Sequence, residues 1–146
     1  MKNSKNPNHA RRLARRKALQ AIYQWDMADH DVSEVIRQFE SFQDMEKADT
    51  EYFHSLVRGV CLDVDRLDAH IATHMPRNID EVDPIERSAL RLACCEFLDH
   101  LEVPYRVVIN EAIDLTKMFG AEQGHKFVNG VLDQLARELR SVESGG

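Results

Sequence analysis

A cluster of basic residues stands near the start of the chain, in the segment Arg11-Arg12-Leu13-Ala14-Arg15-Arg16-Lys17. Residues 1–25 carry seven of the 19 Lys and Arg residues and none of the 25 Asp and Glu residues, although the whole chain has a net charge of −6. Guanidinium groups can bind a phosphate through two parallel hydrogen bonds. This charge asymmetry therefore indicates a polyanion-binding segment on an otherwise acidic protein, and RNA is the first candidate.

A helical wheel separates the side chains of this segment, because each residue of an α-helix advances by about 100°. Arg12, Arg16 and Tyr23 fall within about 40° of one another, roughly opposite a stripe of alanines, whereas Arg15 lies nearer the edge of that stripe. We expect the first three to face solvent together, where the tyrosine ring can stack on a base. The alternative is an ordinary solvated helix face with Tyr23 packed into the core.

Histidines and cysteines offer weaker candidate sites. His70 and His74 stand four residues apart, a spacing that can hold a metal, but no third ligand and no H-E-x-x-H motif accompany them. Cys61, Cys94 and Cys95 lack C-x-x-C spacing and are expected to be reduced, mostly buried thiols. The sequence therefore predicts no metal site and no cofactor.

Acidic residues gather in the middle of the chain, at Glu81, Asp83, Glu86, Glu96, Asp99 and Glu102. Paired carboxylates can perform acid–base chemistry, but on a helical surface they more often form a solvated face or a docking patch for a basic protein. No P-loop, G-x-G-x-x-G or G-x-S-x-G motif occurs. We therefore expect that the protein is not an enzyme.

Prolines and glycines divide the N-terminal half into helices. Between Pro7 and Pro76 there is no proline and only one glycine, Gly59, which predicts long helices. A first helix is expected from Asn8, a possible N-cap, through the basic segment, and a short second one follows. Apolar residues over 53–71 then recur at spacings of 4, 3, 4, 3 and 4, which predicts one long amphipathic helix.

The C-terminal half also has a helical pattern. Pro84 and Pro104 stand where the next two helices should begin. The stretch 107–109 could pass for a strand, but the apolar residues after it continue with helical spacing. Gly120 and Gly124 mark a turn before the last helix.

These elements predict an all-α fold of about seven helices in two small packed bundles. We expect the bundles to span residues 1–78 and 79–140, followed by a flexible tail over residues 141–146. No apolar run approaches the ~20 residues that a membrane helix needs. The N-terminus is too polar for a signal peptide, so a soluble, cytoplasmic protein is expected.

The most specific strings lie in the C-terminal third. The string VPYRVVINEAIDL begins at Val103, Phe119-Gly120 follows it, and HKFVNGVLD begins at His125. Together with the arginine-rich first helix ending in Ala21-Ile22-Tyr23 and the segment Arg87-x-x-Leu90-Arg91-x-Ala93, they resemble the transcription antitermination factor NusB family. The resemblance covers about residues 9–140.

The resemblance implies an all-helical protein of two small bundles that binds single-stranded, boxA-type RNA in ribosomal RNA leaders. It also implies a heterodimer with NusE, the small-subunit ribosomal protein that doubles as a transcription factor. Together the two would join the antitermination complex on RNA polymerase, by assembly and not by catalysis. Whether the free protein is a monomer or a homodimer stays open.

The resemblance also implies roles for individual residues. RNA binding falls to two segments, Arg11, Arg12, Arg15 and Arg16 in the first and Lys126 and Phe127 in the second, while Glu86 and Arg91 lie on the partner-facing helix. Family members often have an acidic residue followed by Ser just before His-Lys-Phe, where this chain has Gln123-Gly124. Loss of a negative charge there would ease the approach of RNA.

On a helical wheel, the final helix has a core-facing stripe and a separate flank that could bind a ligand. Phe127 points about 100° away from Val128, on a flank shared with Gly130 and away from the core stripe. A glycine inside a helix costs about 1 kcal/mol relative to alanine, which suggests that another backbone or a ligand comes close. We expect Phe127 to be partly exposed and to stack on a base, with Lys126 at a nearby phosphate; the alternative is a tight contact with a neighbouring helix.

Three classes of function remain compatible with the sequence. An RNA-binding assembly factor needs the basic segment and a partner surface, whereas a protein-binding helical adaptor needs only the surface. A third possibility is an RNA-binding partner of an RNA-modifying enzyme, since NusB-like domains also occur attached to RNA methyltransferases. This chain carries no glycine-rich cofactor loop, so it would modify RNA only through another polypeptide.

Overall fold

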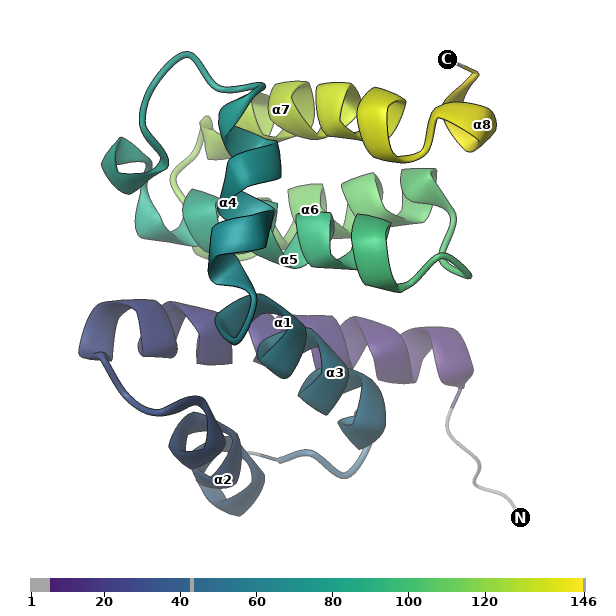
Figure 1. Ribbon diagram of the computed structural model, residues 1–146. Coiled ribbons are helices and arrows are strands. Elements are labelled where there is room, and N and C mark those ends of the chain that lie inside the picture. Colours follow the sequence, from purple (N-terminus) through teal and green to yellow (C-terminus); the bar gives the residue numbers. More distant parts are fainter. Residues whose placement is uncertain (1–5, 43, 146) are drawn as a thin grey trace.

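The computed structural model describes residues 6–42 and 44–145, and these residues form helices in two layers (Figure 1). The α-helices are α1 (Pro7–Ala28), α2 (Val32–Phe42), α3 (Thr50–Cys61), α4 (Val64–Ala72), α5 (Pro84–Asp99), α6 (Tyr105–Phe119), α7 (Gly124–Leu139) and α8 (Ser141–Ser144), with a 3₁₀ turn η1 (Ile79–Glu81) before α5. One layer holds α1, α2 and α3, and the other holds α4 to α8. The predicted all-α fold is confirmed.

Helix α1 starts two residues earlier than its sequence suggests. Asn6 is the N-cap, because its side chain accepts hydrogen bonds from the backbone N–H groups of Asn8 and His9. Pro7 occupies the first helical position, where its missing N–H costs nothing. The helix ends at Asp29, whose φ of 55° lies in the left-handed region.

The expected single helix over residues 53–71 is wrong. The chain leaves the helix at Leu62 and Asp63, and α3 and α4 are separate. After α3 the chain passes from the first layer to the second, where α4 packs on α5 and α7, so the chain must turn between α3 and α4 (Figure 1). The apolar spacing continues through the turn because each of the two helices buries an apolar stripe. Such spacing shows which residues are buried, but it does not show whether they belong to one helix or to two.

Helix α5 is the centre of the fold. Asp83 caps it by accepting hydrogen bonds from the backbone of Ile85 and Glu86, with Pro84 at the first position. Every residue over 88–97 is buried, because α1 and α3 cover the helix from one layer and α4, α6 and α7 from the other. The two bundles therefore share one continuous apolar core.

The end of the chain holds the loop between α5 and α6 in place. Arg140 is 6% exposed, and its guanidinium donates to the backbone oxygens of Glu96, Phe97, His100 and Val103. We expected a loose tail from Ser141, but a helical turn forms over Ser141–Ser144, and its Glu143 accepts from Arg140. Residue 146 lies outside the described residues.

Candidate nucleic-acid interface

The basic residues of α1 do not share one environment. Arg12 is exposed, Arg11 and Arg16 are half-buried, and Arg15 is buried. A helix that lies along the second layer must turn part of its circumference inward, and α1 does so toward α5 and α6 (Figure 1). The arginines therefore have to be judged one at a time.

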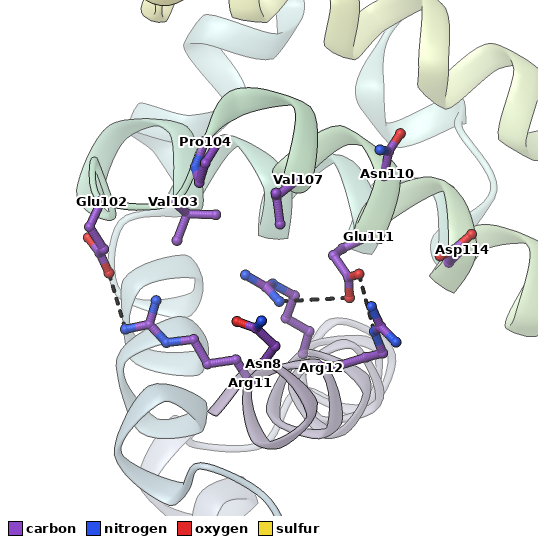
Figure 2. Close-up of a pocket in the computed structure, with 11 residues that line it drawn as sticks. Asn8, Arg11, Arg12, Glu102, Val103, Pro104, Val107, Asn110, Glu111 and Asp114 are labelled. Atoms are coloured by element: carbon purple, nitrogen blue, oxygen red, sulfur yellow. Dashed lines mark hydrogen bonds and ion pairs between the residues drawn. The ribbon is translucent and has the colours of Figure 1, made fainter. Parts of the chain in front are cut away.

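Arg12 presents its charge to solvent at the edge of α6. Its side chain is 57% exposed, and its Nε donates to Oε2 of Glu111 at 3.3 Å. Figure 2 shows the side chain of Glu111 reaching from α6 toward this arginine. The contact fixes the guanidinium while leaving most of its surface open.

Arg11 lies beside the N-terminal turn of α3. Its guanidinium carbon sits 4.1 Å from the ring centroid of Tyr52, a cation–π contact. Figure 2 shows its ion pair with Glu102 in the α5–α6 loop. The Nη2 of Arg11 lies 3.2 Å from an oxygen of Glu102, and its Nε lies 4.0 Å from Asp49. Arg11 therefore stays at the surface, held by an aromatic face and two carboxylates.

Arg15 lies inside the protein. Its side chain is 5% exposed, and its Nε donates to both carboxylate oxygens of Glu96 at 3.0 Å. Glu111 lies 3.7 Å from its Nη1, and the Tyr52 hydroxyl donates to Glu96. Burial alone would lower the pKa of Arg15, but the attraction of Glu96, Tyr52 and Glu111 outweighs burial and raises it. Its guanidinium is committed to this buried network and is not presented to a ligand, in contrast to the expectation for an RNA contact.

Arg16 and Tyr23 continue the outward face of α1. Tyr23 is 37% exposed, so the alternative of a tyrosine packed into the core is wrong. Arg16 is half-buried, and its Nε is buried without a hydrogen-bond partner among the described residues. Arg16 also lines a hollow together with Lys117 and Met118 of α6.

Two hollows join into one groove between α1 and α6. The first has a volume of about 530 Å³ and lies between the start of α1 and the start of α6 (Figure 2). The second, of about 430 Å³, lies further along α6. Both are lined by Arg12, Glu111 and Asp114, so they adjoin. One wall carries the exposed Arg12 beside the half-buried Arg11 and Arg16, and such a basic wall suits a phosphate backbone.

The second predicted RNA segment lies at the start of α7. Lys126 is exposed, and Phe127 is half-buried with the guanidinium carbon of Arg77 5.2 Å from its ring centroid. Partial exposure of Phe127 was expected and is confirmed. Apart from its chain neighbours and the backbone of its own helix, no described residue lies within 4 Å of a Cβ built on Gly130, so the alternative of a tight contact with a neighbouring helix is wrong.

Glu86 is the predicted partner-facing residue on α5, and it is 8% exposed. Its carboxylate occupies the space that a side chain at Gly124 would fill: a Cβ built there would lie 2.9 Å from Glu86 Cδ. Burial, together with the neighbouring Asp83, raises the pKa of this carboxyl above its ordinary value. The absence of a side chain at Gly124 thus lets Glu86 fold over the start of α7.

Arg91, the other residue predicted to bind a partner, is 5% exposed. It forms a two-pronged ion pair with Asp68 of α4, at 2.9 and 2.8 Å, and its Nη1 lies 3.4 Å from Asp26 of α1. These contacts tie three helices from the two layers together. The structure places its guanidinium between helices and away from the surface a partner could touch.

The weaker candidates from the sequence have structural roles. His70 and His74 both contact the carboxylate of Glu138 on α7, at 3.0 and 2.7 Å. Within residues 6–42 and 44–145, no group of three or more His, Cys, Asp and Glu residues has the geometry of a metal site. Burial raises the pKa of Cys61 and Cys94 to about 12, so these thiols are protonated and unreactive at neutral pH.

The sequence interpretation missed three residues of this surface. Lys117 adds a positive charge to the groove from α6, Glu111 holds two arginines, and Arg77 covers the ring of Phe127. Lys117 could have been predicted from the sequence, because it is a basic residue about one turn after Asp114 on the polar face of the predicted helix. The other two depend on contacts between segments far apart in the chain.

Comparison with known proteins decides the family. The NusB family model matches residues 12–137, most of the chain. The chain belongs to the NusB family. A transcription antitermination protein NusB from Alcanivorax borkumensis is 49% identical over 144 residues, which cover 99% of this chain and 95% of that protein. Another, from Xanthomonas campestris pv. campestris, is 52% identical over 135 residues, covering 92% and 85%.

Solved structures agree with this membership. NusB of T. maritima superimposes with a TM-score of 0.78 at 30% identity, over 92% of this NusB-family chain and 94% of that one. A chain in the crystal structure of antitermination factors NusB and NusE in complex with dsRNA gives a TM-score of 0.81 at 29% identity, over 89% and 98%. In the described part of this chain, none of the helices combines the length and apolar character needed to cross a membrane.

Proposed function

We propose that this NusB-family protein is an RNA-binding transcription antitermination factor that binds boxA-type RNA together with NusE. It helps to assemble an antitermination complex on RNA polymerase during ribosomal RNA transcription, in the cytoplasm. The observation that carries the proposal is the groove between α1 and α6, with the exposed Arg12 and the half-buried Arg16 on one wall and Lys117 on the other.

The groove fits a single-stranded nucleic acid better than a small molecule. It is open, with Arg12 and Arg16 on the α1 wall and Lys117 beside Glu111 and Asp114 on the α6 wall, whereas a cofactor site encloses most of its ligand. Tyr23 extends the face of Arg12 and Arg16 along α1 and offers a ring on which a base can stack. Lys126 and Phe127 provide a second contact region at the start of α7, of the same lysine-and-aromatic chemistry.

The partner proposal rests on charge and on a solved complex. Outside residues 1–25 the chain is strongly acidic, which suits docking of a basic ribosomal protein. A NusB of the same fold has been crystallised with NusE and double-stranded RNA. Glu86, at the start of α5, is only 8% exposed, so a partner would reach it at the edge of this surface. A bound basic protein would extend the positive track that RNA follows.

A titration of labelled boxA-like RNA at several salt concentrations tests the function. The double variant Arg12→Ala, Arg16→Ala should weaken RNA binding across sequences, and each lost phosphate contact should reduce the slope of log K against log salt by roughly 0.7. The variant Arg37→Ala, Arg58→Ala is the matched control, since it removes the same charge from exposed positions on α2 and α3. Equal slopes for the two double variants would refute the proposed RNA track.

The same titration with NusE present tests the partnership. RNA affinity should rise when NusE is added, and Glu86→Lys should weaken NusE binding without unfolding the protein. Equal dissociation constants with and without NusE would refute the shared surface and favour a protein that binds RNA alone.

A further inference from the structure

Glu111 is an acidic residue in the middle of the basic groove. Its side chain is 11% exposed, and its Oε2 accepts from the Nε of Arg12, whose own side chain is 57% exposed. Among the described residues, this is the hydrogen bond that Arg12 makes, so both terminal nitrogens, Nη1 and Nη2, are without an acceptor. Glu111 therefore holds the inner nitrogen of the arginine and leaves the outer two for another ligand.

Glu111 is itself fixed. It projects from the buried face of α6, and its other oxygen, Oε1, lies 3.7 Å from Nη1 of Arg15. Arg15 is in turn locked onto Glu96 of α5 by Nε at 3.0 Å and Nη2 at 2.9 Å. A series of ion pairs thus connects the buried Glu96, through Arg15 and Glu111, to the Nε of Arg12.

An arginine held in this way loses less freedom when it binds a phosphate, because part of the ordering has been completed beforehand. We propose that Glu111 is a positioning residue for RNA binding, which holds the guanidinium of Arg12 by Nε so that its two terminal nitrogens face the phosphate backbone. This inference rests on the proposed function. It assigns a carboxylate, which by charge alone would repel RNA, a favourable role in binding it.

Two substitutions that remove the same charge test the role. Glu111→Gln keeps an oxygen that can accept from Nε of Arg12, whereas Glu111→Met has similar volume and no such acceptor. If Glu111 acts only by its charge, both variants should bind RNA more tightly than the unmodified protein, and equally. If it positions Arg12, the Met variant should bind about 2- to 10-fold more weakly than the Gln variant, the range expected for one side chain left to be ordered on binding.

Asp114 provides the matched control. It lies one turn further along α6 and lines both hollows, and it has no ion pair with another described residue. Asp114→Asn and Asp114→Met should therefore bind RNA as tightly as one another, because neither substitution releases Arg12. A difference between this pair as large as between the Glu111 variants would overturn the proposal.

A variant lacking Arg12 separates positioning from damage to the fold. In an Arg12→Ala background, Glu111→Gln and Glu111→Met should bind RNA equally, because the group that Glu111 holds is gone. A difference that persists there would show that Glu111 acts through the fold and would refute the proposal. If the Met variant does not fold, as judged by helical circular dichroism, Glu111→Ala takes its place in both comparisons.

The outcome for Arg12 alone tests the function independently. If Arg12→Ala binds RNA as tightly as the unmodified protein, the proposed RNA track fails. If Arg12→Ala weakens binding while Glu111→Met binds as well as Glu111→Gln, only the positioning role of Glu111 fails.

Discussion

Arg15 and Arg12 stand three residues apart in the same basic segment, yet the structure predicts opposite consequences for their loss. The side chains of Arg15 and Glu96 are 5% and 2% exposed and share three contacts of 2.9 to 3.0 Å. Arg15→Ala would leave the Glu96 carboxylate buried, with the Tyr52 hydroxyl as its remaining hydrogen-bond donor among the described residues. Removing one partner of a buried ion pair costs about 3–5 kcal/mol.

This cost should be visible in unfolding. For a chain of this size, 1 kcal/mol corresponds to about 2–4 °C in Tm, so Arg15→Ala should lower Tm by about 6–20 °C. Arg12→Ala removes an exposed partner and should cost about 0–1 kcal/mol. Urea unfolding followed by circular dichroism measures both free energies of unfolding.

RNA binding should show the reverse order. At a temperature where both variants are folded, Arg12→Ala should weaken RNA binding and flatten its salt dependence, whereas Arg15→Ala should retain the slope of the unmodified protein. An Arg15→Ala protein with nearly unchanged stability and a salt slope reduced as much as in Arg12→Ala would refute this reasoning. It would show that Arg15 leaves Glu96 to contact RNA directly.

Two further predictions concern α7. Phe127→Ala should weaken RNA binding by about 1–3 kcal/mol, the value of a base–aromatic stack, and should cost less stability than the roughly 3–5 kcal/mol of a core phenylalanine; a core-sized loss with normal RNA binding by the folded fraction would mean that Phe127 is structural. The hydrogen bond from His74, and then that from His70, lowers the pKa of Glu138 below its ordinary 4.5. Because the folded protein holds this proton less tightly than the unfolded chain, the stabilisation is complete above about pH 4.5 and is lost as pH falls through the lower folded value. The free energy of unfolding of Glu138→Gln should therefore fall less steeply below that pH than that of the unmodified protein, with Asp133→Asn as the control on the same helix, and identical pH profiles for the two variants would contradict the assignment.

The sequence predicted what depends on local pattern. Apolar spacing, prolines and glycines located helices α5, α6 and α7, and the predicted helix over residues 107–109 is confirmed in α6. The turn between α3 and α4 was not predicted, because the helix ends there while the spacing of buried apolar residues continues. A pattern of apolar residues records which positions are covered, and it carries no record of which helix covers them.

The candidate site divides along the same line. The wheel correctly placed Arg12 and Tyr23 at the surface, because exposure of a helix face follows from its angle to the apolar stripe. It could not predict that Arg15 and Arg91 would be buried. Each lies within a helix beside apolar positions, and each is buried because a carboxylate from another helix, Glu96 or Asp68, neutralises it there. Such pairing depends on the tertiary fold.

Because the Glu86 carboxylate lies against Gly124, the effect of a substitution at either position depends on the residue at the other. A serine at position 124, which the family pattern leads one to expect, would bring a Cβ into the volume of the Glu86 carboxylate, and that side chain would have to change rotamer. A mutation at the start of α7 would thus alter the charge displayed by α5, with no change at position 86. The same Glu86 substitution should therefore have different effects in backgrounds with glycine and with serine at 124.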